Sequence, residues 1–231
     1  MKISCIITAG GKGSRFSNIT KKQFYLINKK PILELTIDVF HKLDIINNII
    51  ITLPEDEYFK KNNDLTLKYP KKVSCVIGGV NRQQSVFNAL TYCPEDTDLV
   101  LIHDGVRPFI EESEILNLIE IAKTHKAVIP GNKVKNTIKS VKDNKIINTI
   151  ERNNLIEVYT PQVFNFHLIY ESHKKIKEIQ NTEINFTDDA SILEYFNIPV
   201  YWYESNSNNL KITTQEDIKY AKYLLENKEF I

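Results

Sequence analysis

The chain has 231 residues, of which 26% are charged, and a formal net charge of +1 at pH 7. Such a length can bury the core of one α/β domain or of two small ones. The balanced charge argues against a protein that binds nucleic acid through bulk electrostatics, so any anion specificity must be local. No apolar run approaches the roughly 18 residues of a membrane span, and the N-terminus lacks the apolar region of a signal peptide. We therefore expect a cytoplasmic protein that binds neither nucleic acid nor membranes.

The 3 cysteines and 5 histidines show no metal-binding pattern. Cys5, Cys75 and Cys93 lie far apart without a CxxC pair, and two of them fall within apolar, strand-like runs. Such residues are typical of reduced cysteines in a protein core. We expect no zinc site.

A glycine-rich stretch follows the first predicted strand, Ile3–Thr8, whose apolar, β-branched residues suit a buried parallel strand. Gly10, Gly11 and Gly13 allow a turn with positive φ and let backbone N–H groups approach a ligand closely. Basic side chains surround this turn: Lys12, Arg15 and Lys22. The spacing fits neither a Walker A loop nor a dinucleotide-binding fingerprint. The stretch is thus either a different phosphate-binding loop or a plain strand-to-helix turn.

Helices and strands then alternate along the chain. Apolar periodicity and cap residues predict helices over residues 31–43, 55–67, 81–92 and 111–122. Strands are predicted over residues 49–53, 73–77, 99–102 and 127–130. This order is typical of an α/β fold with a doubly wound, mostly parallel sheet, in which ligands bind at the carboxyl ends of the strands. We therefore expect the glycines at positions 10–13, 78–79 and 105 to meet at one edge of the sheet.

Residues 136–152 are predicted to form a β-hairpin arm, because two alternating runs flank the polar turn Lys142-Asp143-Asn144. A hairpin alone is marginally stable, and this one has no obvious helix to cover its apolar residues. We expect it to pack on another subunit. The alternative is a hairpin that lies on its own domain.

The remaining chain contains a predicted turn at Thr160-Pro161-Gln162, a helix over residues 166–177 and a helix start at Thr187-Asp188-Asp189. A late strand over residues 200–203 precedes a final helix capped by Thr214. No repeat, low-complexity linker or domain boundary is visible. We expect a single domain over residues 1–231.

Several ordered motifs carry a resemblance to a known family. They are Ala9–Arg15, Lys22-Gln23, Gly78-Gly79 with Arg82-Gln83 and Ser85-Val86, His103–Gly105 with Arg107–Phe109, Glu151-Arg152, Thr160–Gln162, Thr187–Ser191 and Leu210–Thr213. Together they resemble the cytidylyltransferases that make CDP-methylerythritol in the non-mevalonate isoprenoid pathway. The resemblance covers nearly the whole chain and implies the Rossmann-like nucleotidyltransferase fold. It also implies the reaction, in which the phosphate of 2-C-methyl-D-erythritol 4-phosphate attacks the α-phosphorus of CTP and pyrophosphate leaves.

The resemblance implies roles for individual residues. Arg15 and Lys22 would contact the triphosphate and stabilise the transition state, and Arg152 and Lys211 would position the incoming phosphate. Residues implied to bind the nucleotide are Ala9, Gly10, Gly11, Gly13, Gly79, Arg82, Ser85, Asp104 and Gly105. Residues implied to bind substrate elsewhere are Arg107, Thr160 and Thr187. A magnesium ion on the phosphates is expected, with Asp104 as its protein contact; a plain salt bridge from Asp104 to Arg107 is the alternative.

In this family a hairpin crosses to the partner subunit and delivers a residue into its site. Arg152, just past the predicted hairpin, is the matching residue, so the resemblance implies a homodimer. Two departures stand out: Lys21 replaces a usual proline, and Asn136 replaces a frequent aspartate beside the arm. The second change leaves the acceptor open.

Two other functions remain alternatives. A sister group of cytidylyltransferases makes CDP-ribitol or another CDP-pentitol for cell-wall or capsule polymers, and it shares the glycine turn and the ending Lys211-Ile212-Thr213. A non-catalytic nucleotide-binding module would keep the glycine sites but could lose Lys22, Arg152 or Lys211, all of which are present. Fold and shared motifs alone do not settle a substrate.

Overall fold

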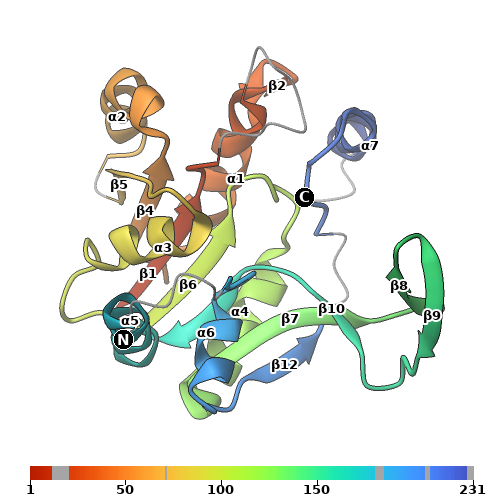
Figure 1. Ribbon diagram of the computed structural model, residues 1–231. Helices are drawn as coiled ribbons and strands as arrows, with labels where there is room; N and C mark the ends of the chain where they lie inside the picture. Colours follow the sequence, from red (N-terminus) through yellow and green to blue (C-terminus); the bar gives the residue numbers. More distant parts are fainter. Residues whose placement is uncertain (12–20, 71, 180–184, 206–208, 228–231) are drawn as a thin grey trace.

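A computed structural model of the chain describes residues 1–11, 21–70, 72–179, 185–205 and 209–227. A mostly parallel sheet of eight strands runs through the centre of the molecule (Figure 1). Its strands are β1 (Ile3–Thr8), β4 (Asn48–Leu53), β5 (Val73–Ile77), β6 (Leu99–Asp104), β7 (Ala127–Lys133), β10 (Ile156–Val158), β11 (Gln162–Asn165) and β12 (Tyr201–Glu204). Their order is β10-β7-β11-β6-β1-β4-β5, and β12 also pairs with β7. The predicted α/β fold with a mostly parallel sheet is confirmed.

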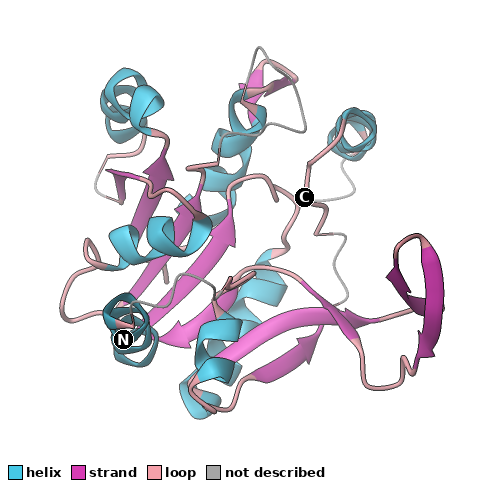
Figure 2. Ribbon diagram, viewed as in Figure 1, coloured by secondary structure: helices cyan, strands magenta, loops and turns pink. Residues whose placement is uncertain are grey.

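Helices cover both faces of this sheet (Figure 2). One face packs on α1 (Ile32–His41), α2 (Glu55–Lys68) and α4 (Glu112–His125), and the other on α3 (Arg82–Leu90), α5 (Phe166–Glu178) and α6 (Ala190–Tyr195). Strand β1 shows why its sequence lacks a polar face: Cys5 and Ile7 enter the first core, and Ile6 enters the second. A third apolar cluster anchors α7 (Gln215–Glu226) beside the short strands β2 (Leu26–Ile27) and β3 (Lys30–Pro31).

The helix starts follow the predicted caps. Pro31 precedes α1, the Asn81 side chain accepts a hydrogen bond from the Gln84 N–H at 2.8 Å, and Thr214 forms a capping box with Asp217. The 3 cysteines are free and buried, as predicted. None of the described helices is long and apolar enough to cross a membrane.

Strand β11 is a feature that the sequence pattern missed. A turn was predicted at residues 160–162, but the chain enters β11 at Gln162 and runs antiparallel between β6 and β7. Four residues are too few to display a period, and the preceding Pro161 suggests a turn. This strand places the side chain of Gln162 in the interior of the protein, where it is fully buried.

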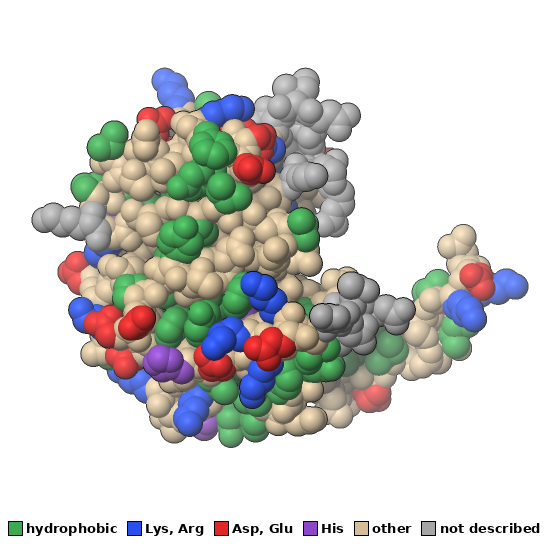
Figure 3. All heavy atoms as spheres, turned by 60° about the vertical axis from the view of Figure 1, so that its left-hand side comes forward, with side chains coloured by type: hydrophobic (Ala, Val, Ile, Leu, Met, Phe, Trp, Pro, Cys, Tyr) green, Lys and Arg blue, Asp and Glu red, His purple; other side chains and the backbone are tan. Residues whose placement is uncertain are grey.

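The predicted hairpin is present as β8 (Ile138–Lys142) and β9 (Lys145–Ile150), which pair as a separate two-stranded sheet. It projects from the body, with hydrophobic and charged side chains along its surface (Figures 1 and 3). Val141, Ile146 and Ile147 are each more than 60% exposed: 61%, 66% and 62%. An arm with so much exposed apolar surface suits a protein partner.

Candidate active site

The carboxyl ends of β1, β4, β5 and β6 border a pocket of about 840 Å³. The predicted site residues that line it are Ala9, Gly10, Gly11, Lys22, Gly79, Arg82, Ser85, Asp104 and Lys211. Three segments far apart in the sequence therefore meet at one edge of the sheet, as the glycine positions predicted. The volume is in the range of pockets that enclose small-molecule ligands.

The Ser85 hydroxyl lies between two glycine turns, the first at Gly10-Gly11 and the second at Gly78-Gly79. A Cβ atom on Gly10 would lie 3.2 Å from the Ser85 hydroxyl oxygen, and one on Gly78 would lie 3.1 Å from it. The same hydroxyl accepts a hydrogen bond from the Gly79 N–H at 2.9 Å and donates to the Asn81 carbonyl at 2.8 Å. Ser85 thus fixes the second glycine turn against the first.

The buried Gln23 side chain supports the first glycine turn with two hydrogen bonds to its backbone. The side chain is 2% exposed, and its Nε2 donates to the carbonyl oxygens of Ala9 at 2.7 Å and Gly11 at 2.9 Å. The sequence motif included Gln23, but its role was missed because no local pattern shows which carbonyls an amide will reach. The next residue back, Lys22, begins the 3-10 helix η1 (Lys22–Phe24) and lines the pocket.

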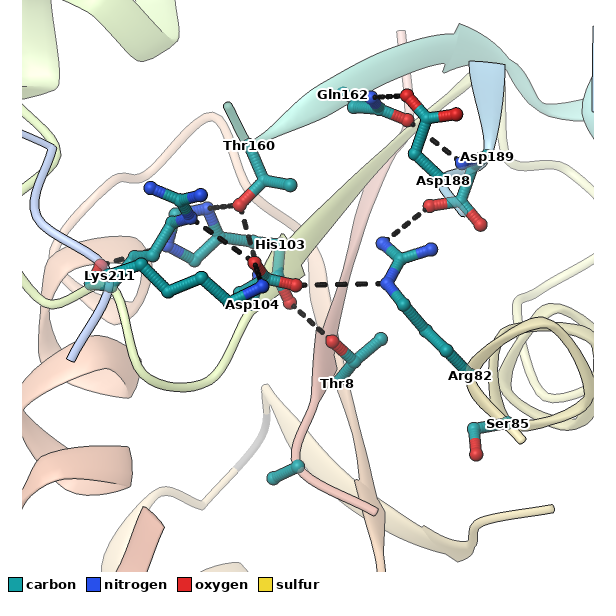
Figure 4. A network of polar contacts seen from close by, with 12 residues as sticks. Thr8, Arg82, Ser85, His103, Asp104, Thr160, Gln162, Asp188, Asp189 and Lys211 are labelled. Carbon is teal, nitrogen blue, oxygen red and sulfur yellow. Dashed lines mark hydrogen bonds and ion pairs between the residues drawn. The ribbon is translucent and has the colours of Figure 1, made fainter. Parts of the chain in front are cut away.

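Asp104 sits among cations at the end of β6 (Figure 4). Its Oδ2 lies 2.8 Å from the Lys211 ammonium and 3.2 Å from Arg107 Nε, and its Oδ1 lies 3.7 Å from Arg82 Nε. Burial alone would raise the pKa of this carboxyl, but the charges of Lys211, Arg82 and Arg107 hold the pKa well below its usual range. Asp104 is therefore ionised at neutral pH. The salt bridge to Arg107, which the sequence left as the alternative, exists within a wider cluster that faces the pocket.

The backbone of Asp104 is held by a buried hydrogen-bond chain. The Asp104 N–H donates to the Thr160 hydroxyl at 3.1 Å, and this hydroxyl lies 3.1 Å from His103 Nδ1. His103 Nε2 faces the Arg107 carbonyl at 2.9 Å. Because a carbonyl only accepts, Nε2 carries the proton and Nδ1 accepts from Thr160. Burial lowers the pKa of His103 to about 4, so its ring is neutral at neutral pH.

Residues 3–227 match the family model of 2-C-methyl-D-erythritol 4-phosphate cytidylyltransferase. The chain belongs to this family. The protein of that name from Clostridium beijerinckii is 43% identical over 228 residues, which span 97% of this chain and 99% of its own. The one from Halalkalibacterium halodurans is 40% identical over 232 residues, which span 99% of each chain. The predicted family resemblance is confirmed.

Solved structures of the cytidylyltransferase family share the fold. The 4-diphosphocytidyl-2C-methyl-D-erythritol synthase of Anaerococcus prevotii has a TM-score of 0.83 and 33% identity, with 97% of this chain and 98% of that one covered. The 2-C-methyl-D-erythritol 4-phosphate cytidylyltransferase of Francisella tularensis has a TM-score of 0.83 and 30% identity, with 96% and 99% covered. The Rossmann-like nucleotidyltransferase architecture is thus established for this cytidylyltransferase chain.

The other described residues that the cytidylyltransferase resemblance implied are absent from the pocket lining. Gly105 is buried and absent from the pocket lining, and its N–H donates to the Thr8 carbonyl at 2.9 Å. Arg107 is buried and donates to the Asn209 carbonyl at 2.7 Å. Thr187 is exposed in the segment before α6. Gly13 and Arg15 lie outside the described residues.

Arg152 lies at the C-terminal end of the arm, past β9, and its side chain is exposed. Its Nη1 donates to the Lys135 carbonyl, at the other foot of the arm. The residue is absent from the lining of the pocket in its own chain. A role in catalysis would therefore need either a movement of the arm or a second subunit.

Proposed function

We propose that the protein transfers the cytidylyl group of CTP to 2-C-methyl-D-erythritol 4-phosphate. A phosphate oxygen of the acceptor forms a bond to the α-phosphorus of CTP as the bond to the pyrophosphate group breaks. The products are CDP-methylerythritol and pyrophosphate. The observation that carries the proposal is a single pocket that Lys22 and Lys211 line together with two glycine turns. Such an in-line transfer depends on positioning and on neutralisation of phosphate charge.

The backbone of Ala9, Gly10, Gly11 and Gly79 would hold the cytidine, with Ser85 beside the base. Glycine backbone of this kind lets anions and base edges approach the main chain closely. Lys22, together with Arg15, would hold the triphosphate and stabilise the charge that develops in the transition state. Lys211, whose side chain is 42% exposed, would receive the acceptor phosphate.

A magnesium ion fits this pocket only together with the nucleotide. Among the described residues, no group of three or more Asp, Glu, His or Cys side chains could hold a metal ion by itself. Magnesium commonly takes one or two carboxylates and completes its shell with substrate phosphates and water. Asp104 offers such a carboxylate at the pocket wall, where Arg82 Nε lies 3.7 Å from its Oδ1. The bound ion would neutralise phosphate charge.

The exposed arm bears on the oligomeric state of the protein. We propose that residues 136–152 bind a second copy of the chain and that the active form is a cytoplasmic homodimer of single-domain subunits. The exposed apolar residues of β8 and β9 support this, because they have no cover within the described part of the chain. Arg152 of the partner subunit would then reach the acceptor phosphate.

Pyrophosphate release from CTP and Mg²⁺ tests the acceptor directly. We expect turnover with 2-C-methyl-D-erythritol 4-phosphate and a kcat/KM at least about tenfold lower with ribitol 5-phosphate, since an acceptor without the matching hydroxyls loses transition-state contacts. Turnover with ribitol 5-phosphate alone would overturn the proposed acceptor. CTP binding without turnover of either acceptor would favour a binding module.

A second prediction concerns the Gln23 clamp, the pair of hydrogen bonds from the Gln23 side chain to the Ala9 and Gly11 carbonyls. In the Gln23→Leu variant the buried Ala9 carbonyl loses its donor, which costs about 1–3 kcal/mol, whereas the exposed Gly11 carbonyl can accept from water instead. We expect the dissociation constant for CTP to rise about tenfold and the unfolding temperature to fall. Calorimetric titration with CTP and thermal unfolding measure both. Gln215→Leu, at an exposed position on α7, is the control and should leave CTP binding unchanged.

A further inference from the structure

A line of ion pairs runs from the pocket into the protein core (Figure 4). Arg82, the first residue of α3, points its guanidinium between two carboxylates. Its Nε lies 3.7 Å from Asp104 Oδ1, and its Nη2 lies 2.7 Å from Asp189 Oδ2. Asp104 belongs to the pocket, whereas the Asp189 side chain is only 1% exposed.

Asp189 occupies the N-cap position of α6 without capping it. Aspartate at an N-cap usually accepts a hydrogen bond from its own helix. Here the Gln162 side chain takes over, since its Oε1 accepts from the N–H groups of Asp189 and Ala190 at 3.1 Å each. Gln162 Nε2 also donates to Asp188 Oδ2 at 2.7 Å. The Asp189 carboxylate is thereby left to face Arg82.

The charge of Asp189 is balanced by Arg82. A buried carboxylate needs a partner, and apart from Arg82 no described residue donates a hydrogen bond to either Asp189 oxygen. The nearby His173 Nε2 lies 3.8 Å from Asp189 Oδ1, but burial lowers the pKa of His173 to about 4, which keeps it neutral. Arg82 therefore supplies the positive charge, and its position is tied to Asp189.

We propose that Asp189 is a positioning residue that holds the Arg82 guanidinium at the pocket wall between Asp189 and Asp104. This inference rests on the proposed cytidylyl transfer. Lys211 contacts Asp104 in the structure but must turn to the acceptor phosphate during the reaction. A fixed Arg82, with Arg107, keeps Asp104 paired when Lys211 leaves. Without Asp189, Arg82 turns onto Asp104 or the triphosphate and disturbs the transferring groups.

A double-mutant cycle between Asp189 and Arg82 tests the coupling. Asp189→Asn keeps the size of the side chain and removes its charge; we expect kcat to fall at least about tenfold while the dissociation constant for CTP stays within about threefold. In an Arg82→Met background the same change should alter kcat by less than about twofold, because Asp189 acts through Arg82. Fold-changes that multiply in the double variant would overturn the proposal.

Further variants separate positioning from simple stability. Glu114→Gln is the matched control: Glu114 is a buried carboxylate that accepts from the Ser205 hydroxyl at 2.9 Å, outside the pocket lining. It should lower the unfolding temperature and leave kcat within about twofold. If Asp189→Asn does not fold, Arg82→Lys provides the test, because an ammonium keeps the charge but cannot span both carboxylates. Unchanged kcat in Arg82→Lys would contradict the proposal.

A crystal structure of the Asp189→Asn variant gives a readout that does not depend on turnover. The Arg82 guanidinium should leave its place beside residue 189 and approach Asp104. An unmoved guanidinium would overturn the positioning role, whichever acceptor the wild-type protein uses. Failure of wild-type turnover with 2-C-methyl-D-erythritol 4-phosphate would instead count against the proposed function.

Discussion

Replacing Lys22 with alanine is expected to lower kcat by about 10²- to 10³-fold, the usual effect of removing a donor that stabilises transition-state charge. Lys22 lines the pocket at the start of η1, directly before the Gln23 clamp, so its backbone is fixed against the glycine turn. The KM for the acceptor should change by less than about threefold, because the proposed contact is with the triphosphate. Steady-state kinetics with both substrates varied measure the two effects.

The neighbouring Lys21 provides a matched control. Its ammonium pairs with Asp56 and lies 3.5 Å from Glu57, both in the first turn of α2. The hydrogen bond from Lys21 lowers the pKa of Asp56 from its ordinary value. Lys21→Ala should leave kcat within about twofold, since exposed ion pairs contribute little. A large loss in kcat with Lys21→Ala, or a change confined to the acceptor KM with Lys22→Ala, would contradict the assigned role.

The sheet and its helices could be predicted because their signals are local. An apolar run such as Ile3–Thr8 reports burial on both faces, and caps such as Asn81 and Thr214 report where helices begin. The glycines could be placed at one edge because parallel strands end on the same side. The family resemblance then suggested which of the nearby basic residues carry function.

The supporting contacts of the site could not be predicted, since they join residues without any periodic relation. Arg82 and Asp189 are distant in sequence, and their pairing depends on Gln162, which sits on a strand too short to show a pattern. Thr160 is another residue whose contacts the sequence pattern did not reveal. It was expected to bind substrate, whereas its buried hydroxyl contacts the backbone of Asp104 and the ring of His103. Whether it also contacts substrate stays a prediction.

The second large effect concerns Arg152 and the arm. Arg152→Ala should raise the KM for the acceptor by at least about tenfold, because a charge-assisted contact to its phosphate is lost. The residue is exposed and absent from the pocket lining of its own chain, which favours action on a second subunit. At acceptor concentrations well below the wild-type KM, Arg152→Ala homodimers should keep at most about a tenth of the wild-type rate, and Lys22→Ala homodimers still less.

Mixing these two variants distinguishes action within a chain from action across the dimer. After subunit exchange, half of the dimers are mixed, and in each the site with intact Lys22 receives Arg152 of the partner subunit. Equimolar mixing should therefore restore about a quarter of the wild-type activity. If Arg152 served its own chain, every site would still lack one of the two residues, and nothing would be regained. Lys22→Ala mixed with Lys211→Ala is the control: both residues line the pocket of one chain, so no mixed dimer contains an intact site.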